Sequence, residues 1–226
     1  MTETLQLRER LNSVRAGINA AAAAAGRDSS SITLVVVTKF HPAPLVRELH
    51  DLGVRDFGEN RHQEAQAKST ALSDLDLTWH FVGQLQSKKA RQAAAYARVI
   101  HSLDRNSVID ALSSDERHTD VFVQVNLAEG TGRGGVAEAD VETIADRILS
   151  TPGLNLLGVM AVAPLGETPR RAFARLRAAS ERVIRIAPKA RFISAGMSGD
   201  YPEAILEGAT HLRIGSAITG NRQPDG

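Results

Sequence analysis

Lys39 is the residue of this sequence with the clearest capacity for covalent chemistry. It closes the run Ile-Thr-Leu-Val-Val-Val-Thr-Lys at positions 32–39, which predicts a strand buried on both faces, as in a parallel sheet. We expect the stem of a lysine at such a strand end to lie in apolar surroundings, where desolvation lowers the pKa of the amine. A neutral amine attacks aldehydes, so Lys39 is a candidate Schiff-base former. The alternative is a strand-end lysine whose ammonium group reaches water.

Two turns near the end of the chain combine glycine with serine and predict a phosphate site. Glycine lets backbone amides approach a phosphate closely, and a hydroxyl adds a further donor. Either turn alone could be no more than a turn, but each follows one of the last two expected strands, where barrel enzymes often hold phosphate. The candidate residues are Ser194, Met197, Ser198 and Gly199 in the first turn, and Gly215 and Ser216 in the second.

Three further polar residues lie within or directly after expected strands. Asn60 could hydrogen-bond a ligand or cap the helix that follows it. His80 alternates with Trp79 and Phe81, so it should face inward if those aromatic side chains pack outward under helices; the alternative is a satisfied core histidine. Arg213 would face a ligand if it points inward, and would reach solvent between helices if it points outward.

Several other kinds of site are disfavoured. The segment 130–135, Gly-Thr-Gly-Arg-Gly-Gly, matches the dinucleotide-binding pattern but lacks the acidic residue expected about twenty positions later. We interpret it as a flexible mouth loop carrying Arg133. No P-loop is present, and the seven histidines form no metal-binding motif, so no metal is expected. Because cysteine is absent, disulfides, thiolate catalysis and Cys-ligated zinc are excluded.

Composition excludes further classes of partner. The 226 residues are 42% hydrophobic and 23% charged, which is ordinary for a globular protein, and the net charge is +1. This balance provides no electrostatic reason to expect nucleic acid or an anionic membrane. No apolar run reaches the length of a membrane span, and the N-terminus lacks an apolar signal segment, so we expect a cytoplasmic protein.

Strands and helices are predicted to alternate along the whole chain, which is typical of parallel strands joined by helical crossovers. We expect an α/β fold, a single (β/α)8 TIM barrel domain over residues 1–226, with an open doubly wound sheet as the competing architecture. The expected strands are 32–39, 54–57, 78–82, 99–102, 120–126, 154–159, 191–194 and 211–214. The expected crossover helices are 44–52, 59–72, 86–97, 105–114, 136–150, 168–187 and 202–207.

Two of the expected helices have predicted faces. The extra N-terminal helix over 2–25 should bury a stripe of Leu5, Leu11, Val14 and Ile18 and end at Gly26. The helix over 59–72 should turn Gln63, Glu64 and Lys68 toward water.

Five motifs together resemble the YggS family of pyridoxal phosphate (PLP) homeostasis proteins, also called the proline synthase co-transcribed family. The resemblance runs from about residue 5 to residue 220, with the motifs in family order. They are Val-Thr-Lys at 37–39, Phe-Gly-Glu-Asn at 57–60, Trp-His-Phe-Val-Gly-Gln-Leu-Gln at 79–86, Gly-Met-Ser at 196–198 and Arg-Ile-Gly-Ser at 213–216. Two segments depart from the pattern: Phe40-His41-Pro42 stands where many members have Thr-Lys-Pro, and Arg61-His62 stands where many have Tyr-Val.

The resemblance implies a barrel like the N-terminal domain of alanine racemase, with PLP held covalently by Lys39. It implies that the two serine-containing turns cradle the phosphate, that Asn60 lies near the ring, and that Arg213 approaches the pyridine nitrogen. An arginine cannot give up a proton, so it would leave that nitrogen unprotonated and the ring a weak electron sink. The full set of expected cofactor-binding residues is Lys39, Asn60, His80, Ser194, Met197, Ser198, Gly199, Arg213, Gly215 and Ser216.

The first functional hypothesis is a monomeric, non-catalytic PLP carrier that supplies apo forms of PLP-dependent enzymes. The alternative is an amino-acid racemase, which needs a base on each face of the substrate carbon. In alanine racemases the second base is a tyrosine from an additional domain, for which we expect no room here; the chain's own tyrosines are Tyr96 and Tyr201. A third hypothesis, a phosphosugar enzyme, would need carboxylates at strand ends, where only Glu59 and Glu129 are candidates.

Overall fold

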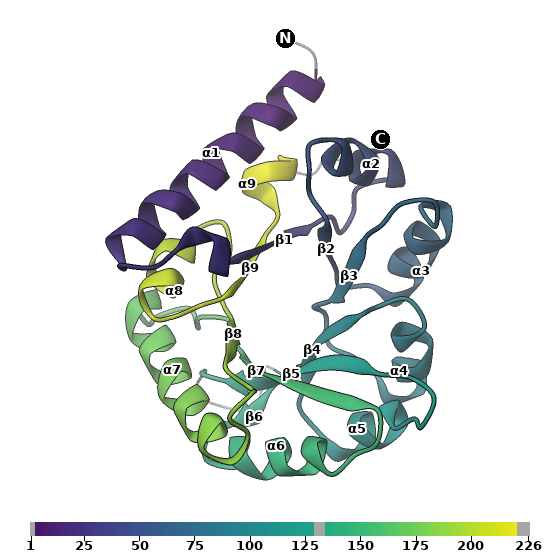
Figure 1. Ribbon diagram of the computed structural model, residues 1–226, viewed down its shortest axis with the longest axis vertical. Helices are drawn as coiled ribbons and strands as arrows, with labels where there is room; N and C mark the ends of the chain where they lie inside the picture. The colour runs from purple at the N-terminus through teal and green to yellow at the C-terminus, as the bar shows by residue number, and fades with distance from the viewer. Residues whose placement is uncertain (1–2, 129–133, 221–226) are drawn as a thin grey trace.

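The computed structural model describes residues 3–128 and 134–220. Within these residues, eight parallel strands close into a barrel with helices around its outside (Figure 1). Around the barrel each strand pairs with the next, β4 pairs with β5, and β9 pairs with β1 to complete the ring. The barrel strands are β1 (Thr33–Val37), β2 (Asp56–Glu59), β3 (Thr78–Phe81), β4 (Val99–Leu103), β5 (Thr119–Asn126), β7 (Leu154–Met160), β8 (Phe192–Ser194) and β9 (His211–Ile214). The predicted barrel is confirmed.

The helices follow the strands in the expected alternation. They are α2 (Ala43–Asp51), α3 (His62–Ala71), α4 (Ser87–Ala94), α5 (Asn106–Leu112), α6 (Val141–Leu149), α7 (Pro169–Ile186), α8 (Tyr201–Leu206) and α9 (Ser216–Thr219). Short 3-10 turns, η1 (Ser29–Ser31) and η2 (Glu138–Asp140), precede β1 and α6.

Two predicted boundaries are wrong for reasons of backbone pairing. The helix expected from residue 136 begins only at Val141, because residues 136–137 form a short strand, β6 (Val136–Ala137), that pairs with the end of β5. The second strand runs to Glu59 instead of ending at Phe57, because Glu59 pairs with Phe81 of β3. Glu59 is therefore a strand residue, and not the first residue of a helix.

The barrel wall separates two environments. On β1, Val36 belongs to the apolar layer under the helices, while Val35 is equally buried on the opposite, inner face. Among the described residues, the layer under the helices forms one large apolar cluster, whereas the inner face has only a small one, Val99, Phe122 and Met160. Most of the apolar core thus lies outside the barrel, and the interior has room for polar side chains.

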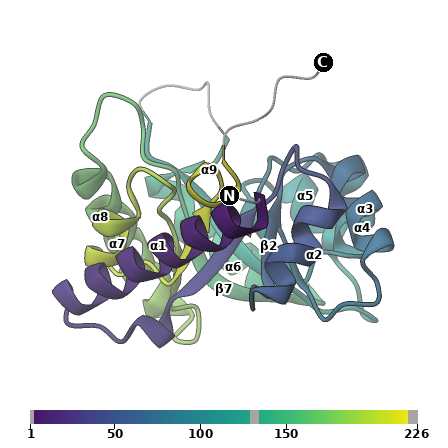
Figure 2. The same cartoon turned by 90° about the horizontal axis from the view of Figure 1, so that it is seen from above.

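An N-terminal helix, α1 (Glu3–Ala24), lies outside the barrel against α8 and α9 (Figures 1 and 2). Its buried stripe is Leu7, Leu11, Val14 and Ile18, spaced four, three and four residues apart. Leu5 was predicted in the stripe but is 48% exposed. Leu7 lies four residues before Leu11 and shares its face of the helix, whereas Leu5 lies six residues before Leu11 and points elsewhere. Gly26 ends the helix as predicted: it adopts a φ of 63°, and its N–H bonds the Ala23 carbonyl.

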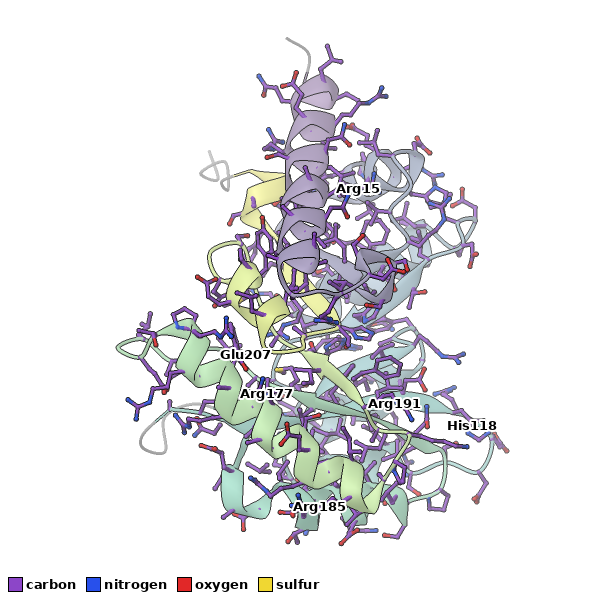
Figure 3. The ribbon with its side chains drawn as sticks, turned by 60° about the vertical axis from the view of Figure 1, so that its left-hand side comes forward. Arg15, His118, Arg177, Arg185, Arg191 and Glu207 are labelled. Carbon is purple, nitrogen blue, oxygen red and sulfur yellow. The ribbon has the colours of Figure 1, made fainter. Side chains whose placement is uncertain are left out.

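A carboxylate at the end of α8 ties this helix to α7. The Glu207 side chain is 5% exposed, and its Oε2 lies 3.0 Å from Nη1 of Arg177; Arg170 contacts its other oxygen (Figure 3). Among the described residues, no helix combines the length and apolar character needed to cross a membrane.

Candidate functional site

Lys39 lies one residue beyond the last ladder hydrogen bond of β1. The N–H of Thr38 donates to the Gly58 carbonyl at 3.0 Å, so the extended chain reaches Thr38. The alternation of the strand then directs residue 39 to the same side as Val35 and Val37, the inner side. The Lys39 side chain is exposed, so the expectation that apolar walls surround it is wrong. The physical reason is that the chain turns at Phe40, which lifts Lys39 above the buried layer.

The two predicted phosphate turns meet beside this strand end. The hydroxyls of Ser198 and Ser216 lie 3.4 Å apart, and the N–H of Ala217 donates to Ser198 Oγ at 3.2 Å. A Cβ at Gly215 would lie 3.3 Å from the Val37 carbonyl oxygen, so the second turn packs directly against the end of β1. The structure thus brings Ser198, Ser216 and the Lys39 segment to the carboxyl ends of neighbouring strands.

The first turn is shaped around Asp200 and two glycines. Its carboxylate accepts the Met197 N–H at 2.6 Å, and the Met197 side chain is 38% exposed at the rim. Gly196 has a φ of 92°, and a Cβ there would lie 2.8 Å from Ala204 Cβ, so only glycine fits. A Cβ at Gly199 would meet nothing within 4 Å, which leaves open space above the turn.

Arg213 points into the barrel, as one of its two predicted orientations requires. Its side chain is buried, with Nη1 donating to Ser194 Oγ at 2.6 Å and Nη2 donating to the Ala161 carbonyl at 2.8 Å. Burial lowers the pKa of Arg213 to about 10, and the charge of Asp200 opposes that shift. Arg213 therefore keeps its proton at neutral pH and acts only as a donor.

A hydrogen-bonded chain continues from Arg213 through the barrel interior. Ser194 Oγ lies 2.8 Å from His101 Nδ1, His101 Nε2 lies 2.9 Å from His80 Nδ1, and His80 Nε2 lies 2.9 Å from Asp56 Oδ1. Burial, followed by nearby positive charges, lowers the pKa of His101 well below 6.5, so this ring is neutral. Arg213 donates to Ser194 Oγ, and the neutral His101 ring, with one donor and one acceptor nitrogen, links Ser194 to His80.

His80 thus faces inward as predicted, but its hydrogen bonds run to His101 and to Asp56 at the amino end of β2, away from the Lys39 turn. Ser194 likewise lies within the barrel, with its hydroxyl engaged by Arg213 and His101. Their predicted contacts with a cofactor remain predictions.

Asn60 carries an acceptor with no partner. Its Oδ1 is buried and makes no hydrogen bond within the described part of the chain. The capping alternative is wrong, since α3 begins at His62 with Arg61 as its N-cap. Gly83 closes over this segment, because a Cβ there would lie 2.2 Å from the Asn60 carbonyl oxygen. A buried polar atom left unpaired is costly, so this amide has hydrogen-bonding capacity that a ligand could use.

The sequence pattern of one family covers almost the whole chain: that of the alanine racemase N-terminal domain matches residues 9–223. A relative in Pseudomonas aeruginosa named "Pyridoxal phosphate homeostasis protein" is 41% identical over 221 residues, which are 95% of each chain. The chain belongs to the pyridoxal phosphate homeostasis protein family.

Solved structures agree with this assignment. PipY of Synechococcus elongatus, a family member solved with PLP bound, is 36% identical and superposes with a TM-score of 0.81 over 95% of this chain and all of that one. Alanine racemase from Corynebacterium glutamicum superposes with a TM-score of 0.67 over 92% of this chain and 60% of that chain. At 16% identity, the latter shows a shared fold alone.

The two departures from the family pattern contact each other. The guanidinium of Arg61 lies 4.6 Å from the centroid of the Phe40 ring, a cation–π distance, and Lys39 Nζ lies 5.8 Å from the same centroid. The two substitutions therefore form one unit at the mouth of the barrel.

Neither tyrosine of this family member lies at the Lys39 site. The Tyr201 hydroxyl points to α1, where a Cβ on Gly17 would lie 2.1 Å from it. Tyr96 stacks on His62 at the helical layer, with its hydroxyl 3.4 Å from His62 Nδ1.

Of the two carboxylates considered from the sequence, one can be placed. Glu59, considered as a catalytic carboxylate, is 1% exposed and paired with Lys68. Residues 129–133, which include Glu129 and Arg133, lie outside the described residues.

Proposed function

We propose that this protein binds pyridoxal 5'-phosphate reversibly through Lys39 and acts in PLP homeostasis as a carrier. The supporting observation is that the end of β1 that precedes Lys39 packs against the serine-containing turn after β9, which itself contacts Ser198 of the turn after β8. When bound, PLP supplies an aldehyde that forms a covalent bond with an amine. The residues present fit this group, because open space lies above Gly199 and the Asn60 side-chain oxygen has no partner among the described residues.

Each site residue then has a distinct role. The hydroxyls of Ser198 and Ser216 donate to the phosphate, with backbone N–H groups at Gly199 and Gly215 beside them. Arg213, held by Ser194 and the Ala161 carbonyl, offers a donor to the ring nitrogen and keeps its own proton. A ring whose nitrogen stays unprotonated stabilises carbanions poorly, which favours binding over catalysis.

The same geometry disfavours a racemase. Racemisation needs a second base opposite Lys39, and both tyrosine hydroxyls lie against other elements, at Gly17 and at His62. We therefore propose a non-catalytic role, as a cytoplasmic monomer that delivers PLP to apo-enzymes.

The absorption spectrum of the protein mixed with PLP tests this proposal. Wild type should gain a visible band, borohydride should fix the adduct, and mass mapping should place it on Lys39. Lys39→Ala should lose the band, while Lys189→Met, which alters an exposed lysine, should keep it. A wild type that shows no band beyond that of free PLP would contradict the proposal. So would D-isomer formation from L-alanine at about one turnover per second, since typical enzymes reach that rate.

A further inference from the structure

A fully buried lysine lies beneath the Lys39 turn. Lys68 of α3 is 5% exposed, although its position on the helix predicted a solvent-facing side chain. Its Nζ lies 2.7 Å from each of three acceptors: the Thr38 carbonyl, Glu59 Oε1 and Glu64 Oε1. An ammonium has three donors, so each is used and the burial of the charge is compensated.

Two of these contacts bracket Lys39. The Thr38 carbonyl belongs to the peptide unit that precedes Lys39, and Lys68 donates to it. The Phe40 N–H belongs to the peptide unit that follows Lys39, and it donates to Glu64 Oε1 at 2.5 Å. A single ion pair on α3 therefore holds the backbone on both sides of the reactive lysine.

Glu59 completes the arrangement from β2. Its Oε1 accepts from Thr38 Oγ1 at 2.7 Å as well as from Lys68. Burial raises the pKa of Glu59, and the hydrogen bonds and charge of Lys68 oppose that shift. Lys68 and Glu59 thus hold residue 38 through its backbone carbonyl and its side chain, and Glu64 holds the N–H of Phe40.

The segment they hold is strained. Phe40 has a φ of 68°, and it is the one non-glycine residue with positive φ among those described. Such conformations are costly for residues with a Cβ and persist only where surrounding contacts enforce them. Exposed turns without such a grip would relax, and the direction of residue 39 would change with them.

We propose that Lys68, Glu64 and Glu59 are positioning residues that hold the 38–40 turn and so aim the Lys39 amine at the two serine-containing turns. This inference rests on the proposed PLP binding through Lys39. An amine displaced by about 1 Å from its reacting partner can lose about a hundredfold in reactivity. These contacts should therefore affect the formation of the covalent bond between Lys39 and PLP, and should leave the affinity for the phosphate group unchanged.

Lys68→Met tests the proposal, because methionine keeps the length of the stem and removes the charge. Two ligands are titrated: PLP, and pyridoxine 5'-phosphate, in which an alcohol replaces the aldehyde, so that it reports the phosphate turns without Lys39. We expect Lys68→Met to lower the affinity for PLP and its capture rate by about tenfold or more, and to change pyridoxine phosphate affinity less than about twofold. The matched control, Lys189→Met, should change neither.

If Lys68→Met fails to fold, Glu64→Ala carries the same test, since it removes the Glu64 carboxylate that accepts from the Phe40 N–H and leaves Lys68 paired with Glu59. Equal loss of both ligands, or loss of neither, would overturn the positioning role while wild type still formed its Lys39 adduct. A wild type that binds both phosphates alike and forms no adduct would instead overturn the proposed function, and this inference with it.

Discussion

Three imidazole rings share the barrel interior, where barrels of this kind usually pack branched apolar side chains. His80, His101 and His211 have ring centroids 5.1–6.4 Å apart. His211 also packs edge-on against Phe122 and Phe192, at 5.2 and 5.5 Å. Burial, with the charges around it, lowers the pKa of His211 to about 4. A proton on this ring would be poorly solvated, so the folded protein excludes it.

Stability should consequently fall on mild acidification. The folded state holds His211 neutral down to about pH 4, whereas the unfolded chain protonates it near pH 6.5. Between these values the unfolded chain binds more protons, so stability present above about pH 6.5 is lost as the pH falls. From about pH 7.5 to about pH 5.5, His211 alone should remove about 1.3 kcal/mol from the free energy of unfolding, measured by urea titration.

His211→Phe isolates this contribution. Phenylalanine fills the aromatic contacts, and Thr210 Oγ1 keeps its hydrogen bond to the Ile193 carbonyl. The variant should lose less stability than wild type over the same pH interval, by roughly the amount above. Identical pH profiles would show that His211 titrates alike in both states.

Some residues of the site could be predicted from the sequence, and others could not. Lys39 and the turns around Ser198 and Ser216 could be predicted as neighbours, because parallel strands bring their carboxyl ends to one face. The burial of Lys68 could not, since helical period identifies a face of α3 and not what packs against it. An i, i+4 spacing with Glu64 was the available signal, and it is equally typical of solvated pairs.

At the scale of elements, hydrophobic pattern predicted the alternation of strands and helices, and hydrogen-bond partners decided where each one ends. Residues 211–214 were predicted without error because a buried run is bounded by polar residues and glycine on both sides. β6 was missed because its two residues are strand only by pairing with β5. No local pattern carries that information.

The packing of α1 on α8 depends on one glycine. A Cβ at Gly17 would lie 2.1 Å from the Tyr201 hydroxyl and 3.2 Å from the carbon that bears it. Alanine in place of a mid-helix glycine normally stabilises by up to about 1 kcal/mol, but overpacking costs about 1–3 kcal/mol. Gly17→Ala should therefore lower the free energy of unfolding of wild type, measured by urea titration.

In a Tyr201→Phe background the oxygen is gone and the nearest remaining atom is a ring carbon. Gly17→Ala should then be close to neutral or mildly stabilising, so the double-mutant cycle should show coupling of about 1 kcal/mol or more. Additive effects would mean that Tyr201 does not contact α1 at this position.

At the scale of the whole molecule, the proposed site lies on a seam formed by β8, β9 and β1. These strands are adjacent in the barrel, although β1 begins the sheet and β9 ends it (Figure 1). The strands that close the barrel are thus the ones expected to hold the ligand. Residues that meet across this seam are far apart in the sequence, so the loop-closure entropy lost on forming their contacts is large. A ligand gripped from both sides of it should stabilise the barrel as a whole.

PLP at about one hundred times its dissociation constant should raise the free energy of unfolding by about 2.7 kcal/mol. For a chain of this size that corresponds to a rise in Tm of roughly 5–10 °C, measured by calorimetry.

Hydrogen exchange should slow most at residues 37–41, 195–200 and 214–219, and least in α4 and α5 across the barrel (Figure 1). Lys39→Ala should lose most of the rise with PLP but respond like wild type to inorganic phosphate, because the serine-containing turns are intact. Equal slowing in α4 and α5 would place the ligand elsewhere, since protection by a bound group is strongest in the segments that contact it.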